Sequence, residues 1–245
     1  MAHIRCDFRS EILDMGTSMT VILPEGKDAS SVPVLYLFHG LADNCTGWTR
    51  YTSVERYARE YGIAVIIPEV QRSFYADMAL GLDYFKFIHD ELPEICKHLF
   101  NITTDPRMTY IAGLSMGGYG AMKCALTTPK RYAGCGAFSA VMNIKKTFNE
   151  AKDGRRSEYD AIFGASVPSV SDLHTLLENV DASIFPSVYI SCGEEDVRFE
   201  QSIEMKHLLD AKGIANTFES WPGDHNWIFW DSAVKKCLDF FFGGK

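Results

Sequence analysis

The chain has 245 residues, 47% of them hydrophobic, so it is long enough to bury one large core. Its formal net charge of −8 at pH 7 argues against a nucleic-acid-binding surface. The seven cysteines form no C-x-x-C pair, so we expect reduced thiols and no metal site. No apolar stretch approaches the roughly 18 residues of a membrane span, and the N-terminus lacks an apolar leader. We therefore predict a cytoplasmic protein with no membrane partner.

Secondary-structure patterns follow the chain from its start. Residues 4–8 and 17–23 are typical of antiparallel edge strands. From residue 34, continuously apolar runs alternate with segments of helical periodicity, which predicts a mostly parallel central sheet with helices on both faces. The predicted strands are 34–38, 63–67, 108–112, 133–138, 187–192 and 216–221, and the predicted helices are 54–61, 84–98, 118–128, 200–212 and 227–241.

The alternation fails between residues 140 and 186. The first half of this segment, from Lys145 to Asp160, is dense in side chains of both charges. A membrane-seeking lid would need a broad apolar stripe instead. We predict a solvated cap insertion over the sheet, within a single domain that spans residues 1–245.

A serine stands at the junction of a predicted strand and a predicted helix. Ser115 is flanked by Gly113 and Gly117 in a G-x-S-x-G motif. A turn this tight brings the residues two before and two after the serine nearly into contact, which glycine allows. The pattern predicts a nucleophile elbow, with Ser115 as the nucleophile of an α/β-hydrolase fold.

The general base is expected after the nucleophile in the chain order of this fold. His207 follows Ser115 but falls within a predicted helix, where a structural role is typical. His225 lies in the loop between the last predicted strand and the last predicted helix. Because active sites gather at the carboxyl ends of parallel strands, we predict His225 as the base.

The acid should follow another strand. Glu194, Glu195 and Asp196 come directly after the predicted strand 187–192 and Gly193. A turn that begins at the glycine would point the two glutamates toward solvent. We predict Asp196 as the residue that orients the base, with Glu195 in reserve.

An oxyanion requires two donors, and two backbone amides are candidates. Met116 follows the nucleophile at the start of its helix, and Leu41 follows the predicted strand 34–38. Gly40 lets the backbone turn inward there, while His39 is interpreted as structural. Gly40 and Trp48 are the candidate substrate-binding residues. Trp48 either lines an acyl pocket, together with Cys45, or anchors its loop.

Several motifs along nearly the whole chain carry a family resemblance. They are Phe38-His39-Gly40-Leu41, Arg72-Ser73-Phe74-Tyr75, Glu91-Leu92-Pro93, Gly113-Leu114-Ser115-Met116-Gly117-Gly118-Tyr119-Gly120-Ala121, Gly193-Glu194-Glu195-Asp196 and Gly223-Asp224-His225-Asn226-Trp227. These motifs resemble the esterase D-like "putative esterase" family of α/β-hydrolases, and most closely its tributyrin esterases. The resemblance implies cleavage of small-molecule esters with short acyl groups, a triad of Ser115, Asp196 and His225, and no cofactor.

Alternatives remain from the same and from another class. S-formylglutathione hydrolases, which cleave a thioester, carry a different loop where this chain has residues 69–75, and acetyl-xylan and feruloyl esterases are more distant relatives. A catalytically inactive binding module of the same fold is the alternative from another class. The run of phenylalanines at 240–242 exceeds what one helix face buries, which leaves a homo-oligomer open.

Overall fold

One eight-stranded sheet organises the computed structural model, which describes residues 1–244. Its strand order is β1-β2-β4-β3-β5-β6-β7-β8, and the prediction of a mostly parallel sheet is confirmed. β1 and β2 are antiparallel to each other, β2 is antiparallel to β4, and all other neighbours are parallel. The strands are β1 (Ala2–Ser10), β2 (Met15–Leu23), β3 (Val34–Phe38), β4 (Ala64–Pro68), β5 (Thr109–Leu114), β6 (Gly134–Phe138), β7 (Ser187–Gly193) and β8 (Asn216–Trp221).

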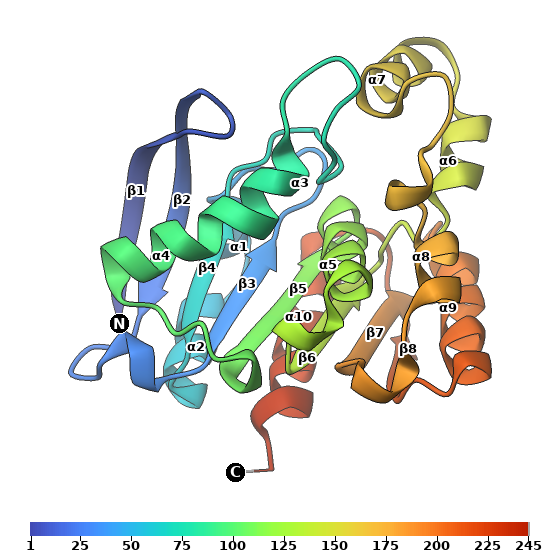
Figure 1. Cartoon of the computed structure of the whole chain (residues 1–245). Helices are drawn as coiled ribbons and strands as arrows, with labels where there is room; N and C mark the ends of the chain where they lie inside the picture. Colours follow the sequence, from blue (N-terminus) through green and yellow to red (C-terminus); the bar gives the residue numbers. More distant parts are fainter. Residues whose placement is uncertain (245) are drawn as a thin grey trace.

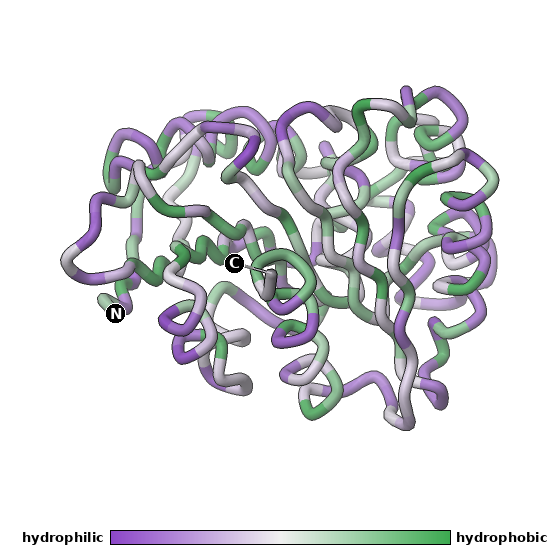
Figure 2. The backbone as a smooth tube through the Cα atoms, turned by 90° about the horizontal axis from the view of Figure 1, so that it is seen from below, coloured by the Kyte–Doolittle hydropathy of each residue, from purple (hydrophilic) through white to green (hydrophobic). Residues whose placement is uncertain are grey.

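Helices cover both faces of the sheet (Figure 1). Successive side chains of a strand point to opposite faces, so Tyr36 joins one buried cluster and its neighbours Leu35 and Leu37 join the other. Figure 2, in which the backbone is coloured by the hydropathy of each residue, shows hydrophobic residues concentrated in the middle of the molecule and hydrophilic residues around them. One face carries α4 (Leu92–Phe100), α5 (Met116–Thr127), α8 (Leu173–Asn179) and α9 (Phe199–Lys212), and the other carries α1 (Gly47–Tyr51), α2 (Val54–Tyr61) and α10 (Trp227–Phe242).

The predicted helix 84–98 is not one regular helix. It begins as α3 (Tyr84–Lys86), continues as a π-helical turn (Phe87–Glu91) and only then becomes α4. Pro93 has no N–H to donate to the carbonyl oxygen of His89 one turn earlier, and the guanidinium of Arg131 donates to that oxygen instead. The prediction of one regular helix over residues 84–98 is therefore wrong at residues 87–91.

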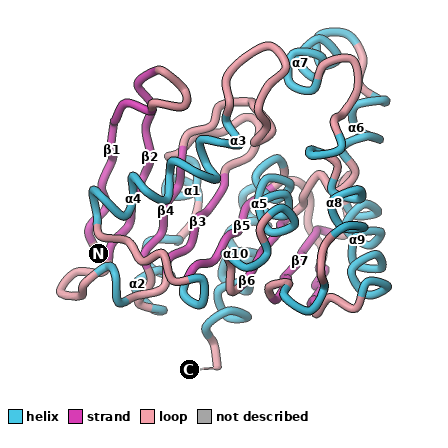
Figure 3. The backbone as a smooth tube through the Cα atoms, viewed as in Figure 1, coloured by secondary structure: helices cyan, strands magenta, loops and turns pink. Residues whose placement is uncertain are grey.

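The segment 140–186 contributes three helices, of which α6 (Ile144–Glu150) and α7 (Asp153–Phe163) lie beyond the carboxyl ends of the strands, among loops (Figure 3). The large apolar side chains of α7 are buried. Tyr159 and Phe163 contact the ring of Phe74, with ring centroids 5.3 and 6.0 Å apart. Helix α7 thus turns its large apolar side chains inward, while its charged side chains are exposed or partly exposed. That the segment acts as a cap stays a prediction.

The last helix, α10, packs along one face of the sheet through residues such as Val234 and Leu238. Of the three consecutive phenylalanines at its end, Phe240 is 39% exposed and Phe242 is buried. The homo-oligomer stays a prediction. No helix within residues 1–244 is both long and apolar enough to cross a membrane.

Candidate active site

Ser115 occupies a strained turn between β5 and α5. Its backbone has φ 51° and ψ −114°, a conformation that a residue with a side chain rarely adopts. A Cβ atom on Gly113 would lie 2.4 Å from the carbonyl carbon of Gly117, and one on Gly117 would lie 2.4 Å from the carbonyl oxygen of Phe38. Both neighbours must therefore be glycine, as the sequence pattern indicated.

Ser115, His225 and Asp196 form one hydrogen-bonded chain. Nε2 of His225 lies 3.0 Å from Oγ of Ser115, and Nδ1 lies 2.8 Å from Oδ2 of Asp196. His225 comes from the loop between β8 and α10, called here the histidine loop (residues 222–226). Asp196 comes from the loop after β7, the acid loop (residues 194–198). The fold thus brings together three side chains that are far apart in the sequence.

The carboxylate of Asp196 is buried but well supplied with donors. Burial would raise its pKa, but hydrogen bonds from His225, Ser139 and the N–H of Arg198 outweigh burial and lower the pKa. The Ser139 hydroxyl also accepts a hydrogen bond of 3.1 Å from the indole of Trp230. The carboxylate therefore stays ionised beside the imidazole, as an orienting acid requires.

The acid loop and the histidine loop are joined through their backbones. The N–H of Glu194 donates to the carbonyl oxygen of Trp221, and the N–H of Glu195 donates to that of Gly223, both at 3.1 Å. The exposed carboxylate of Glu195 accepts the N–H of Gly223 and makes no hydrogen bond to the imidazole. A Cβ on Gly193 would lie 2.2 Å from the Gly223 oxygen, so the two loops are in direct contact.

Two backbone amides are free near the elbow. Within residues 1–244, the N–H groups of Leu41 and Met116 have no hydrogen-bond partner. Met116 is the first residue of α5, where the positive end of the helix dipole lies. A Cβ on Gly40 would lie 2.5 Å from Cδ1 of Leu114, so a larger residue there would force the Leu114 side chain to shift. Leu41 and Met116 are the two residues predicted as oxyanion donors, and that role stays a prediction.

Trp48 is fully buried. Its indole donates a 3.0 Å hydrogen bond to the carbonyl oxygen of Phe38, and its ring meets Trp227 and Phe138 edge-on. Cys45 is buried as well. In this structure Trp48 supports the end of β3, which fits the loop-anchor alternative, and its contact with substrate stays a prediction.

Arg72 connects the loop after β4 to the cap. Its guanidinium forms an ion pair with Glu158 of α7, and Nη1 donates to the carbonyl oxygen of Leu41 at 3.3 Å. Sequence reasoning assigned it no role, because its partners lie far away in the chain. The same holds for Ser139, which no motif contains.

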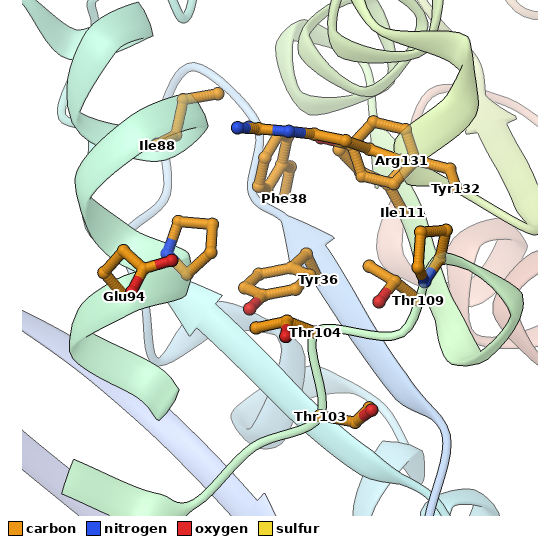
Figure 4. Close-up of a pocket in the computed structure, with 12 residues that line it drawn as sticks. Tyr36, Phe38, Ile88, Glu94, Thr103, Thr104, Thr109, Ile111, Arg131 and Tyr132 are labelled. Atoms are coloured by element: carbon orange, nitrogen blue, oxygen red, sulfur yellow. The ribbon is translucent and has the colours of Figure 1, made fainter. Parts of the chain in front are cut away.

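A separate cavity of about 140 Å³ lies between the start of α4 and the residues Arg131 and Tyr132 that follow α5, over β3 and β5. Figure 4 shows the Arg131 side chain crossing it above Tyr36 and Phe38, toward Ile88. Neither Ser115 nor His225 lines it. No group of three or more His, Cys, Asp or Glu residues within positions 1–244 is arranged to hold a metal ion.

An elbow serine linked through a histidine to a buried aspartate, at the carboxyl edge of a parallel sheet, defines a serine hydrolase of the α/β-hydrolase fold. The family model described as "Putative esterase" matches residues 10–241, and the chain belongs to this esterase family. It is a carboxylic ester hydrolase of the serine type.

Three relatives illustrate the similarity. The chain is 30% identical to an acetyl esterase of Caldicellulosiruptor saccharolyticus, over 98% of each protein. Two structures from Staphylococcus aureus are each 32% identical to this chain, and each match covers 98% of both chains. The substrate-bound fluorophosphonate-binding serine hydrolase F has a TM-score of 0.91, and the S-formylglutathione hydrolase FrmB has a TM-score of 0.88.

Proposed function

We propose that the protein hydrolyses short-chain carboxylic esters through an acyl-enzyme on Ser115. His225 takes the hydroxyl proton as the oxygen attacks the ester carbonyl, and returns it to the leaving alcohol. A water then attacks the acyl-enzyme by the same route, which frees the acid and restores the serine. Asp196 accepts the Nδ1 hydrogen and stabilises the imidazolium. The hydrogen-bonded chain of these three residues is the observation that carries the proposal.

The N–H groups of Leu41 and Met116 stabilise the tetrahedral intermediate in this mechanism. Both amides have no partner within residues 1–244, so they are available to the negatively charged oxygen. A donor of this kind contributes roughly 10²–10³-fold in rate.

The cap supports a preference for small acyl groups in a small-molecule ester. Because α7 buries Tyr159 and Phe163, it has little apolar surface to offer a lipid interface. The acetyl esterase among the relatives is consistent with this preference. We infer a preference for acetyl to butyryl esters, with a decline beyond roughly eight acyl carbons as the pocket length is exceeded. We also infer that the enzyme is cytoplasmic and needs no cofactor.

Thioester hydrolysis is the second candidate, because S-formylglutathione hydrolase FrmB is similar over 98% of both chains. The acyl-enzyme chemistry is the same for both substrates, so only the leaving group separates them. Measuring S-formylglutathione beside 4-nitrophenyl acetate, acetyl-xylan and methyl ferulate would rank the candidates by kcat/KM.

The decisive experiment combines one variant with a series of substrates. We expect Ser115→Ala to lower kcat on 4-nitrophenyl butyrate by at least roughly 10⁴-fold. Ser166→Ala, at an exposed serine of the segment 140–186, should leave kcat unchanged. Esters of 2 to 16 carbons and a triolein emulsion test the acyl preference. Full activity in Ser115→Ala would overturn the mechanism, and a maximum at 12 carbons would overturn the proposed specificity.

A further inference from the structure

His39 precedes the candidate oxyanion amide and is fully buried. The backbone N–H of Val70 donates to its Nε2 at 3.2 Å, and its Nδ1 lies 2.8 Å from the carbonyl oxygen of Gly40. Burial lowers the pKa of His39, and the nearby Glu69 carboxylate only partly opposes this effect. Because Nε2 accepts a hydrogen bond, the neutral ring carries its proton on Nδ1 and donates it to Gly40.

This hydrogen bond fixes the direction of the next amide. The carbonyl of Gly40 and the N–H of Leu41 belong to one peptide unit, and no peptide bond within residues 1–244 is cis. In a trans peptide these two groups point in opposite directions. Holding the carbonyl oxygen against the His39 ring therefore directs the Leu41 N–H away from the ring. The N–H of Asp43 donates to the same oxygen at 3.2 Å and supports this orientation.

The opposite orientation would be harmful to catalysis. If the peptide between Gly40 and Leu41 turned over, a carbonyl oxygen would face the site where negative charge develops, and one donor would be lost. A glycine offers little resistance to such a turn, because its backbone is free to adopt many conformations. Hydrogen bonds to its carbonyl oxygen, from the His39 ring and from the N–H of Asp43, have to supply the restraint.

We propose that His39 is a positioning residue for ester hydrolysis, which donates from Nδ1 to the Gly40 carbonyl and so keeps the Leu41 N–H directed at the oxyanion. This inference rests on the proposed function, since it assumes that Leu41 serves the nucleophile Ser115. Both the ring and the backbone of His39 are held in place. The N–H of Val70 donates to Nε2 of the ring, and the hydroxyl of Tyr75 donates to the backbone carbonyl oxygen of His39 at 2.9 Å.

Two substitutions test the hydrogen bonds of the two ring nitrogens separately. His39→Asn places an amide NH₂ near the position of Nδ1 and keeps the donor to Gly40. His39→Gln reaches the position of Nε2 and keeps the acceptor for Val70. We expect His39→Asn to retain kcat within about five-fold and His39→Gln to lower kcat by at least roughly 30-fold, with KM unchanged in both.

Inhibition by a transition-state mimic tests the role in catalysis, because a merely structural role of His39 would not change it. A methyl trifluoromethyl ketone forms a tetrahedral adduct on the serine, so His39→Gln should weaken its inhibition by the same factor as kcat/KM. Equal losses in both variants, or a loss in KM alone, would overturn the proposal. The Ser115→Ala variant separates the two ideas. If the proposed function is wrong, Ser115→Ala stays active; if only the role of His39 is wrong, Ser115→Ala is still inactive.

The wild-type enzyme gives a test that does not depend on a variant folding. In ¹⁵N-labelled protein, we expect the His39 ring to be neutral with its proton on Nδ1, both with and without the trifluoromethyl ketone. His39→Asn identifies the signal by its disappearance, and if that variant does not fold, Nδ1 and Nε2 are assigned through their couplings to the ring protons. A proton on Nε2 would overturn the proposal.

Discussion

Lys123 is a charged side chain in the interior of the protein. It belongs to α5 and is only 2% exposed. Its ammonium group donates to the carbonyl oxygen of Tyr75 at 3.1 Å and to the hydroxyl of Ser171 at 3.4 Å, and it lies 4.1 Å from the ring centre of Phe85. Burial lowers its pKa from 10.5 to about 8. Folding therefore has to desolvate a charge at neutral pH.

The pKa difference sets the size and direction of the effect. Between pH 8 and 10.5 the unfolded chain holds the Lys123 proton and the folded chain does not, so the free energy of unfolding rises with pH in this window. One pKa unit corresponds to about 1.4 kcal/mol, which makes the full penalty about 3 kcal/mol. The penalty is present in full below pH 8 and is removed above pH 10.5.

Urea unfolding at pH 7 to 10.5 measures this effect. We expect the free energy of unfolding of the wild type, relative to Lys123→Met, to rise by about 3 kcal/mol across that range. Taking the difference cancels the titration of tyrosines and cysteines common to both proteins. Lys97→Met, at an exposed position of α4, is the matched control and should give a flat difference. A flat difference for Lys123→Met as well would refute the reasoning.

Two further predictions concern the acid and the elbow. Asp196→Asn should lower kcat by roughly 10⁴-fold, because it favours the wrong tautomer of the base, whereas Glu195→Gln should stay within a few-fold of wild type; the reverse order would make Glu195 the acid. Gly117→Ala should lower the free energy of unfolding by at least about 2 kcal/mol, since its Cβ would lie 2.4 Å from a backbone oxygen. Gly154→Ala, with open space around it, is the control for thermal unfolding, and equal midpoints would contradict this account.

Local patterns in the sequence predicted most of the sheet and the elbow. The apolar run that forms β3 could be recognised because a strand covered on both faces leaves little choice of side chains. The glycines around Ser115 indicated the turn because only glycine fits there. Chain order then selected His225 and Asp196, whose proximity the structure shows. Whether they perform the predicted roles stays a prediction.

Features that depend on distant residues could not be predicted in this way. The π-helical turn before α4 involves Arg131, which follows it by about forty positions and replaces the donor that Pro93 lacks. The tautomer of His39 depends on the N–H of Val70, which belongs to another loop. Trp48 follows the oxyanion loop in sequence, but its ring packs against rings of two other elements, Phe138 of β6 and Trp227 of α10, so adjacency in the chain did not reveal its surroundings.

The backbone hydrogen bonds between the acid loop and the histidine loop have a mechanical consequence. Because β7 pairs with β8 and the loops that leave them are also joined, the backbone hydrogen bonds hold Asp196 and His225 to each other. Ser115 follows β5, which reaches β7 only through β6. The 2.8 Å contact between aspartate and histidine therefore joins two directly bonded loops, whereas the 3.0 Å contact between histidine and serine joins segments that follow strands which are not neighbours. We therefore expect warming or mild denaturant to break the hydrogen bond between His225 and Ser115 first, while Asp196 and His225 remain paired. Catalytic activity should then be lost before the protein unfolds.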